Sequence, residues 1–128
     1  MQITRISAGA KGLSQFSNVE VACSNEIVDG FEVSLSAALA SPAVRFVSLP
    51  GGFEAGMHPI EERRLVFVMS GVLELGTPDG DARVLGPGDV LLAEDTDTTG
   101  HTTRAVDGPA DLLFVAMGVS DLVGAPAL

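Results

Sequence analysis

The chain has 128 residues, which suits one domain with a buried core and is too short for two domains with a cleft between them. Its composition, 46% hydrophobic and 5% aromatic with neither Trp nor Tyr, is that of a globular protein and not of a disordered one. The net charge of −10 would repel a nucleic-acid backbone, and no apolar run approaches the roughly 20 residues of a membrane helix. We therefore expect neither nucleic acid nor a membrane as a partner.

The first residues indicate the compartment. Residues 1–5 lack the apolar core of a secretion signal. The single Cys23 cannot form an internal disulfide, which agrees with a reducing environment. We expect a cytoplasmic protein in which Cys23 is structural.

The N-terminal third has mixed signals. Residues 19–23 and 31–33 alternate like strands, whereas residues 34–40 suggest a helical turn. We expect residues 1–42 to form strands or an arm that packs on the rest of the domain or crosses to a second subunit.

From residue 43 onward the chain consists of short β-type runs separated by Gly, Pro and Asp. The Pro78-Asp79-Gly80 segment predicts a hairpin between its two flanking runs, because Pro presets one backbone angle and Gly accepts a positive one. Such spacing favours an antiparallel sandwich or barrel over residues 43–118, with residues 119–128 as a loose tail. The predicted runs are 43–49, 64–69, 72–75, 82–85, 90–93, 101–106 and 111–117.

Two motifs in this region resemble those of the cupin superfamily. The first motif, a Gly, then His-x-His, a Glu and a final Gly, is matched by Gly52, His58 and Gly71, but Ile60 stands at the second His and Arg64 at the Glu. The second begins in the Gly-Pro-Gly-Asp turn of residues 86–89 and reaches His101 through a loop about two residues longer than is usual in the family.

The stretch 44–106 also resembles a narrower group of small bacterial cupins, for which we know no single agreed activity. The resemblance implies an all-β, single-domain cupin of RmlC-like type, that is, an antiparallel jelly-roll β-barrel or double-stranded β-helix. It also implies a small-molecule pocket inside the barrel.

In the wider superfamily the two His of the first motif, its Glu and the later His bind iron, manganese, nickel or zinc. Here only His58 and His101 remain. Arg64 places a cation where the anionic ligand would stand, and like charges about 4 Å apart repel by about 4 kcal/mol at an effective dielectric constant of 20. We expect no cofactor; if a divalent metal does bind, we expect His58, His101 and Glu62 as its ligands.

Strand alternation places the remaining candidates. If Arg64 points inward, Val66 and Val68 share its face, and His101 shares a face with Thr103. A buried Arg64 needs an anion, either Glu62 or Glu94 or a group on a ligand. The candidate catalytic residues are His58, His101 and Arg64, and the candidate substrate-binding residues are Arg45, Val66, Val68 and Thr103.

Three functions stay open at this point. The first is a metal-independent enzyme of specialised metabolism, in which two histidines move protons to isomerise, cyclise, dehydrate or decarboxylate a small carbonyl compound. The second is a metal-dependent cupin such as a dioxygenase, and the third is a ligand-binding barrel without chemistry. Because strand 64–69 is apolar on both faces, we also expect a homodimer.

Overall fold

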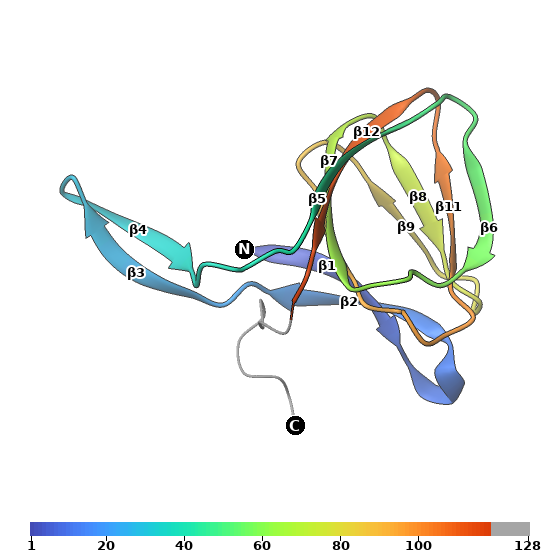
Figure 1. Ribbon diagram of the computed structural model, residues 1–128, viewed down its shortest axis with the longest axis horizontal. Helices are drawn as coiled ribbons and strands as arrows, with labels where there is room; N and C mark the ends of the chain where they lie inside the picture. Colours follow the sequence, from blue (N-terminus) through green and yellow to red (C-terminus); the bar gives the residue numbers. More distant parts are fainter. Residues whose placement is uncertain (119–128) are drawn as a thin grey trace.

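The computed structural model describes residues 1–118, which fold into strands with one short 3₁₀ turn, η1 (Ala10–Gly12). Figure 1 shows two sheets that face each other and a separate hairpin that points away from them. The strands are β1 (Gln2–Ala8), β2 (Ser14–Glu20), β3 (Cys23–Val28), β4 (Phe31–Ser36), β5 (Val44–Leu49), β6 (Glu54–His58), β7 (Arg64–Ser70), β8 (Leu73–Gly76), β9 (Ala82–Leu85), β10 (Val90–Ala93), β11 (His101–Ala105) and β12 (Ala110–Ala116).

The six-stranded sheet has the order β2-β1-β10-β7-β12-β5, and the four-stranded sheet has the order β6-β11-β8-β9. Neighbouring strands are antiparallel, except that β1 lies parallel to β10. The prediction of an all-β jelly roll is confirmed, and the parallel pair is a feature that we did not expect.

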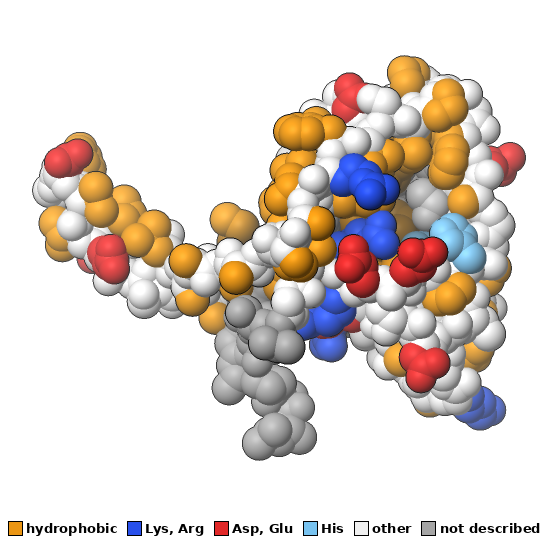
Figure 2. All heavy atoms as spheres, in the orientation of Figure 1, with side chains coloured by type: hydrophobic (Ala, Val, Ile, Leu, Met, Phe, Trp, Pro, Cys, Tyr) orange, Lys and Arg blue, Asp and Glu red, His pale blue; other side chains and the backbone are white. Residues whose placement is uncertain are grey.

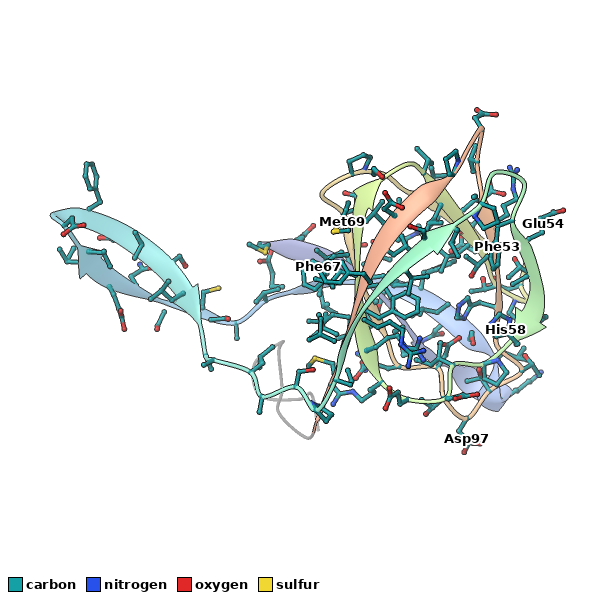
Figure 3. All side chains as sticks on the ribbon, turned by 45° about the horizontal axis from the view of Figure 1, so that its top comes forward. Phe53, Glu54, His58, Phe67, Met69 and Asp97 are labelled. Atoms are coloured by element: carbon teal, nitrogen blue, oxygen red, sulfur yellow. The ribbon has the colours of Figure 1, made fainter. Side chains whose placement is uncertain are left out.

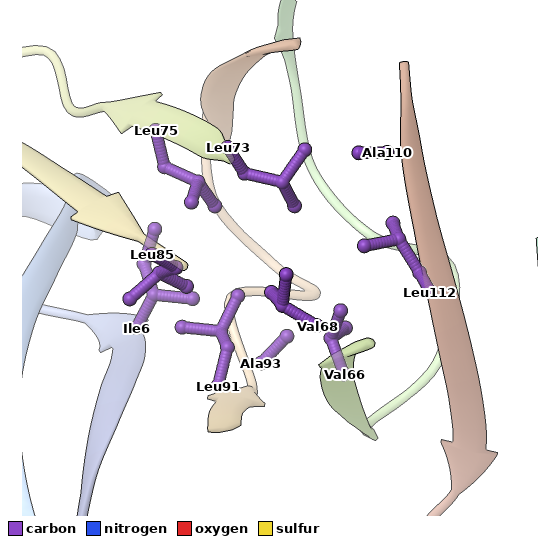
Figure 4. Close-up of a cluster of buried hydrophobic side chains, with 10 residues drawn as sticks. All are labelled: Ile6, Val66, Val68, Leu73, Leu75, Leu85, Leu91, Ala93, Ala110 and Leu112. Atoms are coloured by element: carbon purple, nitrogen blue, oxygen red, sulfur yellow. The ribbon is translucent and has the colours of Figure 1, made fainter. Parts of the chain in front are cut away.

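The main core fills the space between the two sheets (Figure 4). On β7, Val66 and Val68 face this core, whereas Leu65 and Phe67 pack on the outer side of the six-stranded sheet. The alternation predicted for this strand is therefore confirmed. Each fully buried side chain of this kind contributes about 1.5–3 kcal/mol to folding.

The predicted hairpin is also present, as β8 and β9. Its turn contains Gly80 with a φ of 87°, and the Thr77 hydroxyl donates a hydrogen bond to Oδ1 of Asp79. This bond, together with a bond from the backbone N–H of Asp81, holds the pKa of Asp79 below its usual value.

The N-terminal segment differs in part from expectation. Strands β1 and β2 belong to the six-stranded sheet, while β3 and β4 form the projecting hairpin. The prediction of a helical turn at residues 34–40 was wrong. Residues 34–36 belong to strand β4, and residues 37–40 have no regular structure. The predicted loose tail, 119–128, lies outside the described residues. Within residues 1–118, no helix has the length and apolar character needed to cross a membrane.

Candidate functional site

A cavity of about 180 Å³ lies between the two sheets. Figure 2 shows its mouth as a hollow in the face of the molecule, with basic, acidic and histidine side chains around apolar walls. Its volume is below the roughly 300–1,000 Å³ of drug-sized sites, so it suits a small metabolite. Its polar lining residues are His58, Arg64, His101 and Thr103; its apolar ones are Leu49, Phe53, Ala55, Ile60, Val66, Leu73, Leu75, Leu91, Ala93, Leu112 and Phe114.

His101, the first residue of β11, is buried and is held by an acidic partner. Its Nδ1 lies 2.5 Å from Oδ2 of Asp95, whose side chain is completely buried. Since a carboxylate accepts hydrogen bonds, Nδ1 carries the proton, and in the neutral ring Nε2 is the free base. The structure therefore fixes one tautomer of His101 at the cavity wall.

The carboxylate of Asp95 is itself positioned from a distant part of the chain. The hydroxyl of Ser14, at the start of β2, donates to Oδ2 of Asp95 over 2.8 Å and also lies 2.8 Å from Oγ1 of Thr98. Oδ1 of Asp95 is buried without a partner among the described residues. Because Oδ2 accepts hydrogen bonds from both Ser14 and His101, Ser14 helps to fix the orientation of the carboxylate and, through it, that of the His101 ring.

Gly100 brings the loop before β11 against the backbone of His58. It has a φ of 91°, and a Cβ at this position would overlap the carbonyl group of His58. A glycine is thus needed for both its backbone angle and the close approach of the two segments.

His58, the last residue of β6, pairs with His101 across the sheet. Its Nδ1 lies 2.6 Å from the carbonyl oxygen of Gly56 and therefore donates to it, which leaves Nε2 for other partners. The two ring centroids are 5.8 Å apart. Figure 3 shows His58 at one end of β6 and Phe53 beside the other. His58 is exposed, so it forms part of the cavity mouth.

Arg64 comes from the opposite sheet, at the start of β7. Its guanidinium carbon lies 4.8 Å from the ring centroid of Phe114, a cation–π arrangement. No carboxylate of the described residues pairs with it, because Glu94 binds Arg5 and Arg63 instead. Its Nε is buried without a hydrogen-bond partner in residues 1–118, and an unsatisfied buried donor costs about 1–3 kcal/mol.

The structure thus brings His58, Arg64 and His101 together on one cavity, as the sequence predicted. Val66 and Thr103 also line it, whereas Val68 lies deeper in the core. The two remaining candidates lie apart from this cavity: Arg45 and Glu62 are both exposed and line a neighbouring depression that also touches Arg64.

The donor set does not fit the metal centre of the wider superfamily. Among the described residues, no group of three or more His, Cys, Asp or Glu side chains is placed to hold a metal ion. Glu62 lies outside the cavity, so only His58 and His101 of the predicted ligand set line it. The polar side chains of the cavity are two histidines, an arginine and a threonine, and we derive no step through a metal.

Ser14 and the pairing of Asp95 with His101 were not predicted. Ser14 is 81 residues from Asp95 in the sequence, so no local motif joins them. The one available signal was an Asp six residues before the motif His, in a loop rich in Thr.

No protein-family model and no curated protein matches the chain. Among solved structures it is similar to a Cupin 2 conserved barrel domain protein from Salinispora arenicola, with 18% identity, a TM-score of 0.50 and coverage of 77% of this chain and 76% of that one. A DMSP lyase from Ruegeria pomeroyi has 30% identity, a TM-score of 0.48 and coverage of 84% and 51%. A sugar phosphate isomerase of the cupin superfamily from Silicibacter pomeroyi has 28% identity, a TM-score of 0.46 and coverage of 59% and 50%.

The chain spans about half the length of the lyase and of the isomerase. Its two facing sheets, and its similarity to the Salinispora protein over three quarters of both chains, define the class: the chain has the cupin fold. Within that fold its particular feature is an apolar cavity bearing two histidines and an arginine.

Proposed function

We propose that the cavity binds a small carbonyl compound with a carboxylate group and catalyses proton transfer on it without a metal. Isomerisation, cyclisation, dehydration and decarboxylation are the reactions that such a centre serves. The observation that carries the proposal is the Asp95–His101 pair at the wall of a cavity that also holds Arg64, whose guanidinium pairs with no carboxylate of residues 1–118.

His101 is the proposed base. With Nδ1 bound to Asp95, its Nε2 accepts a proton from the carbon next to the substrate carbonyl, and the electron pair of that C–H bond moves to the carbonyl oxygen as an enolate. Asp95 keeps the ring in the reactive tautomer and stabilises the imidazolium that forms.

Arg64 is the proposed anion-binding group. Its guanidinium can donate two parallel hydrogen bonds to a carboxylate or bind an enolate oxygen. The apolar walls exclude water, so this attraction is stronger than it would be in solvent.

His58 is the proposed second proton carrier. Its Nδ1 is bound to the Gly56 carbonyl, and the exposed ring lines the cavity, so the imidazolium form of His58 can return a proton to the enolate or exchange it with solvent. Proton removal at one atom and return at another would give isomerisation.

The test is deuterium exchange into a panel of 2-oxo and 3-oxo carboxylic acids in D₂O, followed by proton NMR. We expect exchange above the buffer rate and a loss of about a hundredfold or more in His101→Asn. Thr96→Ala, on the exposed side of the same loop, is the control and should keep its rate. Equal exchange by wild type and His101→Asn would refute the role of His101, and binding without exchange would favour a non-catalytic barrel.

Elemental analysis of protein purified without chelator tests metal independence. We expect far less than one iron, manganese, nickel or zinc per chain. A content close to one per chain, lost in His58→Ala, would replace this proposal by a metal-dependent cupin.

A further inference from the structure

The β3–β4 hairpin has an apolar face that no other part of residues 1–118 covers. Cross-strand pairing puts Val28 opposite Phe31, Glu26 opposite Val33 and Ser24 opposite Leu35 on one face, so this face is apolar apart from Ser24 and Glu26. Phe31 is 73% exposed, Val28 45% and Leu35 42%. The other face, with Asn25, Glu32 and Ser34, is polar apart from Ile27. The hairpin is thus amphipathic, although it projects away from the barrel (Figure 1).

An isolated two-stranded hairpin is marginally stable in water, and exposed apolar faces of this kind mark interaction sites. All residues of β3 are exposed, and so are all residues of β4 except Val33, which is half-buried. The hairpin therefore needs a partner that its own barrel does not supply.

A second apolar surface, which the described part of the chain leaves partly exposed, lies on the outer face of the six-stranded sheet. The register places Phe46, Leu113 and Phe67 side by side across β5, β12 and β7. Phe46 is 75% exposed, Val44 58% and Met69 47%. Figure 3 shows Phe67 and Met69 on the side of the barrel towards the hairpin, and Figure 2 shows apolar side chains along both surfaces.

We propose that these two surfaces form the interface of a symmetric dimer, in which the apolar face of each hairpin packs on the outer sheet face of the partner. Because a two-fold axis repeats the contact, each copy supplies one hairpin and one sheet face, and both surfaces of both copies are covered without a further protein. Six exposed side chains of on the order of 100 Å² each offer about 600 Å² per copy, which reaches the low end of stable interfaces at about 1,200 Å² in total. The proposal is independent of the chemistry in the cavity.

Sedimentation velocity at micromolar concentrations tests the proposal. We expect the wild type to sediment as a dimer, and Phe31→Asp on the hairpin and Phe46→Asp on the sheet face each to raise the dissociation constant by roughly tenfold or more, because each buries an unpaired charge. Far-UV circular dichroism should remain unchanged, since both side chains lie outside the core.

Two matched controls give the test its specificity. Ile27→Asp lies on the opposite face of the same hairpin, and Val84→Asp lies on β9 of the other sheet; these residues are 69% and 60% exposed, and both variants should remain dimeric. A monomeric wild type would overturn the proposal, as would a dimer that Phe31→Asp and Phe46→Asp both leave intact.

The only cysteine supplies a second measurement. Cys23 is exposed at the start of β3, so a spin label there reports the distance between the two hairpins. We expect one defined inter-label distance in the wild type that disappears in Phe46→Asp. The same distance in both proteins would contradict the sheet face as the docking surface.

Discussion

Oδ2 of Asp95, whose side chain is completely buried, lies 2.5 Å from Nδ1 of His101, a residue that lines the cavity. This pairing orients the His101 ring and places the proton of the neutral ring on Nδ1. It also couples the site to β2 through Ser14, which donates to the same oxygen.

The pairing predicts the tautomers of both histidines. In neutral His101 and neutral His58 we expect the proton on Nδ1, because Asp95 and the Gly56 carbonyl each accept from that atom. Imidazole ¹⁵N NMR measures this directly, and the chain has only two histidines to assign.

Asp95→Asn should change the His101 tautomer equilibrium, since an amide can also donate a hydrogen bond. Ser14→Ala should loosen the ring without changing the tautomer, and His58 should be unaffected in both. An unprotonated Nδ1 on His101 in the wild type would contradict the assignment.

Arg64 predicts selectivity for anions. Arg64→Gln should weaken the binding of a small oxo acid by about tenfold to a hundredfold, because a charge-assisted bidentate pair is worth about 1.5–3 kcal/mol. Isothermal titration calorimetry gives the affinity. Arg45→Gln removes a guanidinium that lines only the neighbouring depression and is the matched control. Equal losses in the two variants would show a general effect of charge rather than a site at Arg64.

The close approach of Gly100 to the His58 backbone predicts that a larger side chain at position 100 destabilises the fold. Gly100→Ala should lower the melting temperature and disturb the His58 and His101 resonances, because its Cβ overlaps the His58 backbone. Gly88 has nearly the same φ, 90°, but open space around it. Gly88→Ala therefore introduces the same backbone strain as Gly100→Ala without a steric overlap. We expect the larger loss for Gly100→Ala by thermal denaturation. A similar loss for both would mean that the close approach to His58 is unimportant.

The β8–β9 turn predicts a pH effect. The hydrogen bond from Thr77 and the backbone bond from Asp81 lower the pKa of Asp79 below 3.8, so the stabilisation is present above that value and is lost as the pH falls through the folded-state pKa. Thr77→Val should raise the pKa of Asp79 and make stability less sensitive to acid. An NMR titration of the Asp79 carboxyl checks this, and an unchanged pKa in Thr77→Val would show that Thr77 does not set it.

Most of the barrel could be predicted from the sequence, because its strands alternate regularly and end at Gly, Pro or Asp. Strand β1 was missed since its buried Ile3 and Ile6 are three residues apart and pack on opposite sides of the sheet. Strand β6 has no such pattern, as Gly56 and the exposed Met57 interrupt it. The β4 extension was mistaken for a helical turn because Ser and Ala dominate it.

Of the site residues, the sequence predicted only those that stand at positions of the two motifs. His58, Arg64 and His101 occupy positions that the motifs fix on the inner faces of strands, so their convergence followed from alternation. Ser14 could not be predicted, because its bond to Asp95 depends on the parallel contact of β1 with β10, which places the start of β2 beside the β10–β11 loop.

The central claim is that His58, Arg64 and His101 act together on one bound anion, and the most direct test follows the two histidine ring signals by NMR during titration with a small 2-oxo acid. We expect both signals to shift with a single dissociation constant, and that constant to rise in Arg64→Gln but not in Arg45→Gln. Signals that shift with different constants, or a constant unchanged in Arg64→Gln, would contradict the claim.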